Sequence, residues 1–215
     1  MNHTFSHIKM NAIGDSITRG TYTAQGESFP ASLAEKPWCS VVGEKMGFES
    51  VENYGINGTS ISSTSPVNTE NAFSLRFDKM RDDADLVVVA GGTNDFGTNV
   101  KLGSANDTHD VSFCGGLHVL CKGLKEKYPS AKVVFIQPIY RSDKEINDNQ
   151  NTLSQYRQAI KEIAHDIYGF FVIDTDIPEF CERAQELFPD GVHPTPEGHQ
   201  IYGEYIAQKI AAILQ

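Results

Sequence analysis

The chain has 215 residues, of which 40% are apolar, so it can bury one substantial core and is short for two domains. We therefore expect a single domain over residues 1–215. Its 18 basic and 28 acidic residues give a net charge of −10, which argues against nucleic acid or an anionic lipid surface as a partner, because such polyanions attract basic patches.

The N-terminal sequence MNHTFSHIK has no apolar segment of the kind that a secretory signal needs. No apolar run approaches the length of a membrane-spanning helix. The cysteines are far apart, with neither a CxxC pair nor the spacing of zinc ligands. We therefore expect a cytoplasmic protein with no metal or other cofactor, whose thiols are buried and reduced. These thiols belong to Cys39, Cys114, Cys121 and Cys181.

Five apolar segments of strand length recur along the chain, with helical patterns between them. Several are unbroken runs of β-branched residues, which is typical of strands that are buried on both faces. Strands that alternate with helices predict a parallel sheet covered on both sides and built from right-handed crossovers. In chain order the expected strands are Ile8–Ile13, Glu49–Tyr54, Leu86–Ala90, Val133–Ile136 and Phe170–Ile173.

The helical segments between these strands show apolar residues on one face. Thr195 as N-cap and Pro196 at the first position are expected to begin the last helix, and Gly47 to end a weaker one. The stretches Phe96–Asp110 and Arg141–Asn151 are predicted to be loops, which in such folds commonly shape binding sites. The weaker helix, which Gly47 ends, covers about Trp38–Met46, and the other expected helices cover about Phe113–Tyr128 and Leu153–Ile167.

The first three expected strands end in polar or glycine-rich sequence. The first leads into Gly14-Asp15-Ser16, the second into Asn53-Tyr54-Gly55-Ile56-Asn57-Gly58, and the third into Gly91-Gly92-Thr93-Asn94-Asp95. In an open parallel sheet, ligands bind at the carboxyl ends of the strands. We therefore expect these three sequences to contribute to one binding site.

Together with Asp190 and His193 near the C-terminus, these sequences supply the groups that acyl transfer needs. A serine hydroxyl becomes a good nucleophile when an imidazole takes its proton, and a carboxylate orients that imidazole. We expect Ser16 to be the nucleophile, His193 the base and Asp190 its orienting partner. The tetrahedral oxyanion needs preorganised donors, which the backbone N–H groups of Ser16 and Gly58 and the amide of Asn94 can supply.

These residues also carry a resemblance to a known family. Gly-Asp-Ser, Asn-x-Gly-x-x-Gly, Gly-x-Asn-Asp and Asp-x-x-His occur in this order from Gly14 to His193, and they match the four blocks of the SGNH hydrolases, also called the GDSL esterase/lipase family. The resemblance implies a three-layer α/β/α sandwich with a mostly parallel, flavodoxin-like sheet of about five strands. It also implies metal-free ester hydrolysis through an acyl-enzyme on Ser16, and the only departure from the blocks is Ile17 in place of leucine.

Each candidate group also has a simpler interpretation. Ser16 could be only a helix N-cap, and Gly58 and Asn94 could serve only their turns. The segment from Gly14 to Gly20 could cradle a phosphate at a helix N-terminus, but it lacks the spacing of phosphate-binding loops. The resemblance over four blocks favours the catalytic interpretation.

The other polar residues of note have no metal-ligand spacing. His109 lies in the long loop after Asn94 and is a candidate for contact with a substrate. We expect Asp15 and Asp95 to be structural, and the remaining histidines to be on the surface or partly buried. These histidines are His118, His165 and His199.

The sequence thus predicts a serine esterase that hydrolyses a small or short-chain carboxylic ester, with an acetylated carbohydrate as one candidate. An acyltransferase would use the same acyl-enzyme and is an open alternative. A non-catalytic carbohydrate-binding module is a second alternative, although it gives no reason to keep nucleophile, base and orienting carboxylate together. The expected partner is a small-molecule ester, and the sequence predicts no particular oligomeric state.

Overall fold

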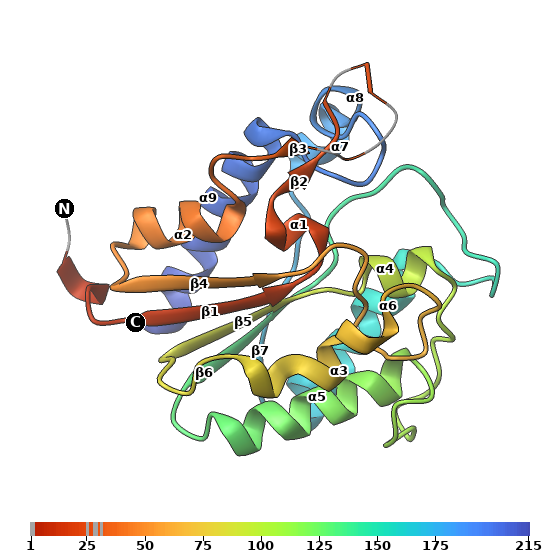
Figure 1. Cartoon of the computed structure of the whole chain (residues 1–215), viewed down its shortest axis with the longest axis horizontal. Helices are drawn as coiled ribbons and strands as arrows, with labels where there is room; N and C mark the ends of the chain where they lie inside the picture. Colours follow the sequence, from red (N-terminus) through yellow and green to blue (C-terminus); the bar gives the residue numbers. More distant parts are fainter. Residues whose placement is uncertain (1–2, 25, 28–29, 31) are drawn as a thin grey trace.

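The fold is built on a central sheet of five parallel strands. The computed structural model describes residues 3–24, 26–27, 30 and 32–215. The strand order is β4-β1-β5-β6-β7 (Figure 1), which is the flavodoxin-like order 2-1-3-4-5 when only these strands are counted. The expected fold class is therefore confirmed. The strands are β1 (Lys9–Gly14), β4 (Ser50–Gly55), β5 (Leu86–Ala90), β6 (Lys132–Ile136) and β7 (Phe171–Ile173).

Helices cover both faces of this sheet and make two separate cores. Side chains alternate between the faces of a strand, so Leu86 and Val88 of β5 pack into one core while Val87 and Val89 pack into the other. The first core lies under α2 (Trp38–Met46) and α9 (Pro196–Leu214), on the upper side in Figure 1. The second lies against α3 (Phe73–Arg76), α5 (Phe113–Lys127) and α6 (Leu153–Ile160).

The expected ends of the long helices are confirmed by their caps. The Thr195 hydroxyl accepts a hydrogen bond from the Gly198 N–H at the start of α9, and Pro196 is the first helical residue. Gly47 ends α2 with a positive φ of 66°, a conformation that favours glycine. Helix α6 continues into π-helical turns, labelled η4 (Lys161–Ile167), which complete the segment expected from the sequence.

Several short elements were not expected, because segments of fewer than two turns show no periodicity. One of them changes a predicted loop: Phe96 and Gly97 belong to α4 (Thr93–Gly97), so the loop begins after them. The others are α1 (Ser16–Arg19), the hairpin of β2 (Thr21–Tyr22) and β3 (Ser32–Leu33), α7 (Pro178–Glu182), α8 (Ala184–Leu187), and the 3₁₀ turns η1 (His3–Phe5), η2 (Thr69–Asn71) and η3 (Phe77–Lys79).

All four cysteines are free thiols, but the expectation that all are buried is wrong for Cys181, which is exposed. In the short helix α7 the buried position belongs to the neighbouring Phe180. Over the described part of the chain, no helix combines the length and hydropathy needed to cross a membrane. The same residues contain no cluster of three His, Cys, Asp or Glu side chains suited to a metal ion.

Candidate active site

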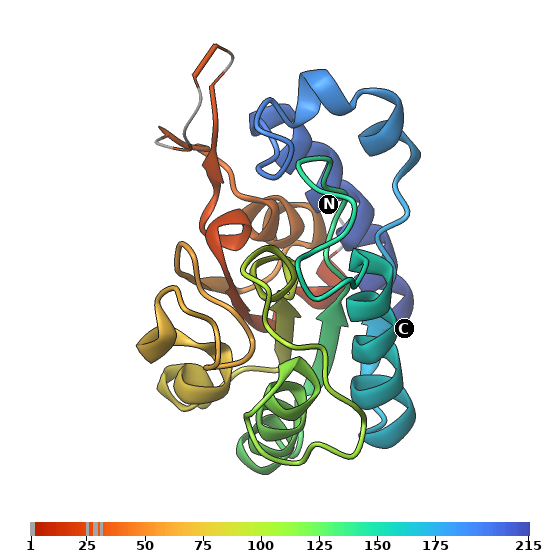
Figure 2. The ribbon, with the colours of Figure 1, turned by 90° about the vertical axis from the view of Figure 1, so that its right-hand side faces the viewer.

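The predicted site residues lie at the carboxyl edge of the sheet, which faces the viewer in Figure 2. Strands β4, β1 and β5 are neighbours, so the three sequences that follow them meet at this edge. The N–H of Ile56, after β4, donates to the carbonyl of Gly14 in β1 over 3.1 Å. The amide of Asn94, after β5, donates to the carbonyl of Thr59 over 2.9 Å. Backbone and side-chain hydrogen bonds thus join the three strand ends.

Ser16, His193 and Asp190 form a continuous chain of hydrogen bonds. The Ser16 hydroxyl and Nε2 of His193 are 2.9 Å apart, and Nδ1 of His193 lies 2.7 Å from Oδ2 of Asp190. Because the carboxylate accepts the proton on Nδ1, Nε2 is left as the acceptor for the serine hydroxyl. Ser16 is only 6% exposed, so its hydroxyl is sheltered from bulk water.

The carboxylate of Asp190 is surrounded by donors. Its Oδ1 accepts the backbone N–H groups of Val192 and His193 over 2.9 and 2.7 Å. Its Oδ2 accepts Nδ1–H of His193 and, over 2.5 Å, the hydroxyl of Thr23. Burial disfavours the charge on Asp190, but hydrogen bonds from His193, Thr23 and Val192 outweigh it and hold the pKa of the carboxyl well below its usual range. Asp190 is therefore a fixed negative charge next to the imidazole.

The turn that carries Ser16 is shaped by its neighbours. Asp15 is the N-cap of α1, with its side chain accepting the N–H of Ile17 over 2.9 Å, so Ser16 is the first helical residue. The simpler interpretation of Ser16 as the N-cap is therefore wrong. Gly14 allows the tight packing of the turn, since a Cβ there would lie 1.9 Å from Oγ1 of Thr18. The serine N–H belongs to the first turn, whose amides have no intrahelical acceptor.

Gly58 occupies a turn that a larger residue would strain. Its φ is +72°, in the left-handed region that favours glycine, and a Cβ there would lie 3.3 Å from Cγ1 of Val67. The side chain of Val67 is 46% exposed beside it. Next along the chain, Thr59 accepts the Asn94 amide. The structure therefore brings Gly58 and Asn94 together at the edge that carries Ser16.

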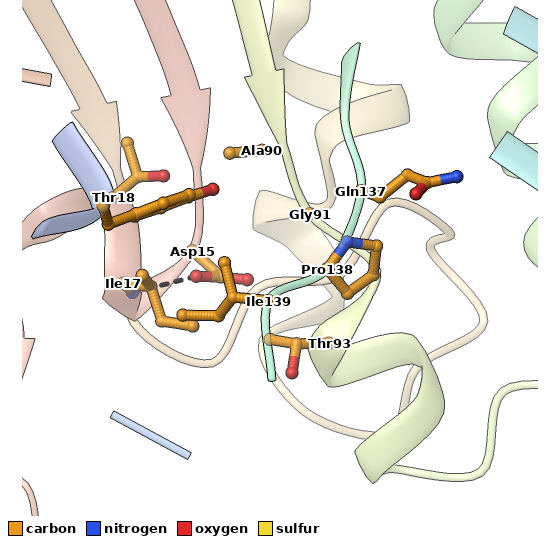
Figure 3. Close-up of a pocket in the computed structure, with 10 residues that line it drawn as sticks. Asp15, Ile17, Thr18, Ala90, Gly91, Thr93, Gln137, Pro138 and Ile139 are labelled. Atoms are coloured by element: carbon orange, nitrogen blue, oxygen red, sulfur yellow. Dashed lines mark hydrogen bonds between the residues drawn. The ribbon is translucent and has the colours of Figure 1, made fainter. Parts of the chain in front are cut away.

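A small cavity lies behind the Ser16 turn (Figure 3). Asp15, Ile17 and Thr18 line it together with residues that follow β5 and β6, including Thr93 and Pro138. Its volume of about 20 Å³ has room for about one water molecule. Burial raises the pKa of Asp15 to about 6.

The loop that begins at Arg141 contacts two parts of the candidate site. Arg141 donates to the carbonyl of Thr93 over 2.6 Å and forms an ion pair with Asp143, also at 2.6 Å. The N–H of Ser142 donates to the carbonyl of Gly191 over 2.8 Å. The loop thus braces α4, which carries Asn94, against the segment between Asp190 and His193.

Two buried charged residues support the strand ends. Arg76 donates to the carbonyls of Gly14, Tyr54 and Asn71, each over 2.7 Å, and burial lowers its pKa to about 10. Asp95 accepts the N–H groups of Ile61 and Ser62 over 2.9 and 3.0 Å, and burial raises its pKa to about 7. Both hold backbone rather than face the site, as was expected for Asp95.

The other histidines lie outside the Ser16–His193–Asp190 chain. His109 lines a groove beside α5 with Phe77 and His118, so the structure does not bring it to the site. The expectation of surface or partly buried histidines holds for the exposed His165 and is wrong for two others. His118 is buried and hydrogen-bonded to the carbonyl of Ala105. His199 is fully buried in α9.

Sequence reasoning did not find the residues that hold the site in place. Thr23, Arg76 and Arg141 are single polar residues in stretches with no periodic or motif spacing. Their roles depend on partners that are distant in sequence: Thr23 and Asp190, for example, are 167 residues apart. Only the predicted loop at Arg141–Asn151 pointed to one of these residues, and it did so without assigning a role to the arginine itself.

A Ser-His-Asp hydrogen-bond chain at the carboxyl edge of a parallel sheet is an arrangement suited to acyl hydrolysis. The sequence profile of the GDSL-like lipase/acylhydrolase family matches residues 12–201. The chain therefore belongs to this family. Together with two esterase-named relatives, family membership makes the protein a carboxylic ester hydrolase.

The relatives differ in how much of their length this chain spans. A multidomain esterase of Ruminococcus flavefaciens is 28% identical over 133 residues, which cover 61% of this chain but only 16% of that protein. An acetylxylan esterase of Geobacillus stearothermophilus is 28% identical over 94% of this chain and 93% of its own length. A crystal structure of an acetylxylan esterase from the same organism is 25% identical, has a TM-score of 0.65, and covers 96% of this chain and 95% of that one. Another crystal structure, 30% identical, gives a TM-score of 0.87 and covers 98% of this chain and 99% of that one.

Proposed function

We propose that the protein is a serine esterase that removes short acyl groups, acetyl above all, from a carbohydrate. The observation that carries the proposal is the chain of hydrogen bonds from Ser16 through His193 to Asp190, at 2.9 and 2.7 Å. Both distances lie in the range needed for proton transfer between nucleophile, base and orienting carboxylate.

In the acylation step, the Ser16 oxygen attacks the carbonyl carbon of the ester while its proton moves to Nε2 of His193. The carbonyl π electrons move to oxygen, and the resulting oxyanion accepts hydrogen bonds from the N–H groups of Ser16 and Gly58 and from the Asn94 amide. Asp190 stabilises the imidazolium. The tetrahedral intermediate then collapses, the bond to the sugar oxygen breaks, and His193 gives its proton to that oxygen.

Deacylation repeats the sequence with water in place of the serine. His193 takes a proton from water as the water oxygen attacks the acyl carbon, and the same three donors hold the second oxyanion. The bond to Ser16 breaks and its oxygen recovers the proton from His193. The products are the free acid and the regenerated enzyme, so no metal or redox group takes part in the proposed cycle.

Two features support a short acyl group and a sugar alcohol. The Val67 side chain stands next to Gly58, so it limits the space beside the proposed oxyanion donors. The relative from Geobacillus stearothermophilus, which aligns over nearly the whole chain, is named as an acetylxylan esterase.

A panel of esters tests the proposal. We expect wild-type protein to hydrolyse p-nitrophenyl acetate and acetylated xylo-oligosaccharides, and p-nitrophenyl octanoate at least about tenfold more slowly, since each misplaced methylene group costs on the order of 1 kcal/mol. Ser16→Ala should lose at least about a thousandfold in kcat, because the nucleophile is gone. Product analysis with added alcohol measures how much acyl group is transferred rather than hydrolysed.

A serine-directed phosphonate provides an independent readout. Mass spectrometry should find one covalent adduct at Ser16 in the wild type and none in Ser16→Ala. Full turnover by Ser16→Ala would overturn the assignment of the nucleophile. Turnover of octanoate equal to that of acetate would overturn the preference for short acyl groups. A missing adduct together with no hydrolysis of any ester would favour a binding module.

A further inference from the structure

We propose that Thr23 is a positioning residue for the reaction, which holds Asp190 and, through it, His193 in register with Ser16. This inference rests on the proposed roles of those three residues. Thr23 is fully buried, directly after strand β2, and its hydroxyl donates to Oδ2 of Asp190 over 2.5 Å. A short hydrogen bond from a hydroxyl to a carboxylate is charge-assisted and stronger than one between neutral groups.

The contacts of Asp190 show why this bond differs from the others. Three of its four described donors come from the loop that contains it: the N–H groups of Val192 and His193, and Nδ1–H of His193. Those bonds shape the loop internally, but they do not locate it relative to the rest of the molecule. Among the described contacts of this carboxylate, only the Thr23 hydroxyl reaches it from another part of the chain.

Thr23 belongs to the segment that carries the proposed nucleophile. Ser16 begins the short helix α1, and Thr23 follows that helix after Gly20 and the two residues of β2. This segment is held in place at Gly20, whose carbonyl accepts the Ala34 N–H over 2.8 Å, and by pairing of β2 with β3. The Thr23–Asp190 bond therefore ties the proposed orienting carboxylate to the same segment that carries Ser16.

The segment that contains Thr23 also contacts the loop that carries Gly58. Residues two apart on a strand point to the same face, and Thr21 and Thr23 are both buried while Tyr22 between them is partly exposed. The Thr21 hydroxyl donates to Oδ1 of Asn57 over 2.8 Å, next to Gly58. The segment from Thr21 to Thr23 therefore contacts the Gly58 loop through the Thr21 hydroxyl and Asp190 through the Thr23 hydroxyl.

A purely structural role of the Thr23 hydroxyl and a positioning role predict different outcomes when the hydroxyl is removed. Loss of an ordinary buried hydrogen bond lowers stability and leaves the turnover of the folded enzyme unchanged. Loss of a positioning contact allows the carboxylate and imidazole to leave their working geometry, so the chemical step slows even in folded protein. Substrate binding involves neither group, so KM should change little.

The test compares variants of Thr23 that keep or lose the donor. Thr23→Val has nearly the same shape without the hydroxyl, and we expect its kcat for p-nitrophenyl acetate to fall about 10- to 100-fold with KM within about twofold, the loss typical of a hydrogen bond to a charged group. Thr23→Ser keeps the hydroxyl and should stay within about threefold of wild type. Thr175→Val is the matched control, because the Thr175 hydroxyl is equally buried but donates to the carbonyl of Pro138.

Thr23→Cys makes the test independent of whether the valine variant folds, since its thiol is similar in size and a weak donor. Its kcat should fall below that of Thr23→Ser, with unfolding monitored by circular dichroism. Wild-type kcat in folded Thr23→Val, or equal kcat in the serine and cysteine variants, would overturn the inference. If those results came with an inactive Ser16→Ala, only the role of Thr23 would fail. If Ser16→Ala stayed active, the proposed function would fail as well.

Discussion

The side-chain amide of Asn94 has two hydrogen atoms, and one of them is already donated to the carbonyl of Thr59. In the proposed mechanism the other points to the developing oxyanion, so a single residue would both fix the loop after β4 and stabilise charge. A donor whose position is set in advance costs little reorganisation when the charge develops. The loop hydrogen bond is therefore part of the reason that the amide can act as a catalytic donor.

Replacement of this amide, compared with replacement of an amide that makes only a structural hydrogen bond, tests the oxyanion role. Asn94→Ala should lower kcat for p-nitrophenyl acetate about 100-fold or more, the usual cost of one oxyanion donor, and should leave KM nearly unchanged. Asn149→Ala is the control, since that exposed amide also donates to a backbone carbonyl, that of Asn99. A loss of activity that is fully explained by a fall in melting temperature would contradict the oxyanion role of Asn94.

Residues with a motif were found from the sequence, and residues without one were not. Ser16 and His193 lie in blocks whose order along the chain is informative, so their meeting could be predicted. Thr23 gives no such signal, because its importance depends on a carboxylate that only folding brings to it. The same holds for His199, whose place in a helix predicted its backbone but not the full burial of its ring.

At the scale of elements, the long helices and strands could be predicted from the sequence and the short ones could not, for a physical reason. The five strands and the long helices repeat an apolar pattern over enough residues to be recognised, and their caps, such as Thr195 and Gly47, fix their ends. Short elements such as α1 and the β2–β3 hairpin have no such repeat. They form because the strand ends on either side of them are already in place, so tertiary contacts decide their structure rather than local propensity.

Arg76 shows how one side chain can join several elements. Its guanidinium donates to carbonyls at the ends of β1 and β4 and in η2, and it lies 5.0 Å from the ring centroid of Phe73. Arg76→Met should lower the free energy of unfolding by about 3 kcal/mol, because three carbonyls lose a charged donor in a buried place. Urea unfolding followed by circular dichroism measures this.

The exposed Arg19 of α1 offers the matched control for this prediction. Arg19→Met removes the same charge and should change the free energy of unfolding by no more than about 0.5 kcal/mol. If Arg76→Met were as stable as Arg19→Met, the view that the guanidinium holds the strand ends together would be wrong. If it were less stable but fully active, the strand ends would keep their positions without it.

At the scale of the whole molecule, buried titratable groups make stability depend on pH in opposite directions. Burial raises the pKa of Asp15 to about 6 and that of Asp95 to about 7, so between pH 4 and 7 the folded state binds more protons than the unfolded state at these sites. Their contribution to stability therefore decreases as the pH rises. His199 acts in the other direction, because burial lowers its pKa to about 4.

The contribution of His199 can be isolated by substitution. Between pH 6.5 and 4 this histidine becomes protonated in the unfolded chain but stays largely neutral in the folded protein. The free energy of unfolding of the wild type therefore decreases as the pH falls. His199→Leu cannot titrate, so its free energy of unfolding relative to wild type should rise by on the order of 3 kcal/mol between pH 6.5 and pH 4. Urea unfolding at several pH values measures the difference, with the exposed His165→Leu as control. A difference that does not change with pH would show that the buried imidazole does not set this dependence.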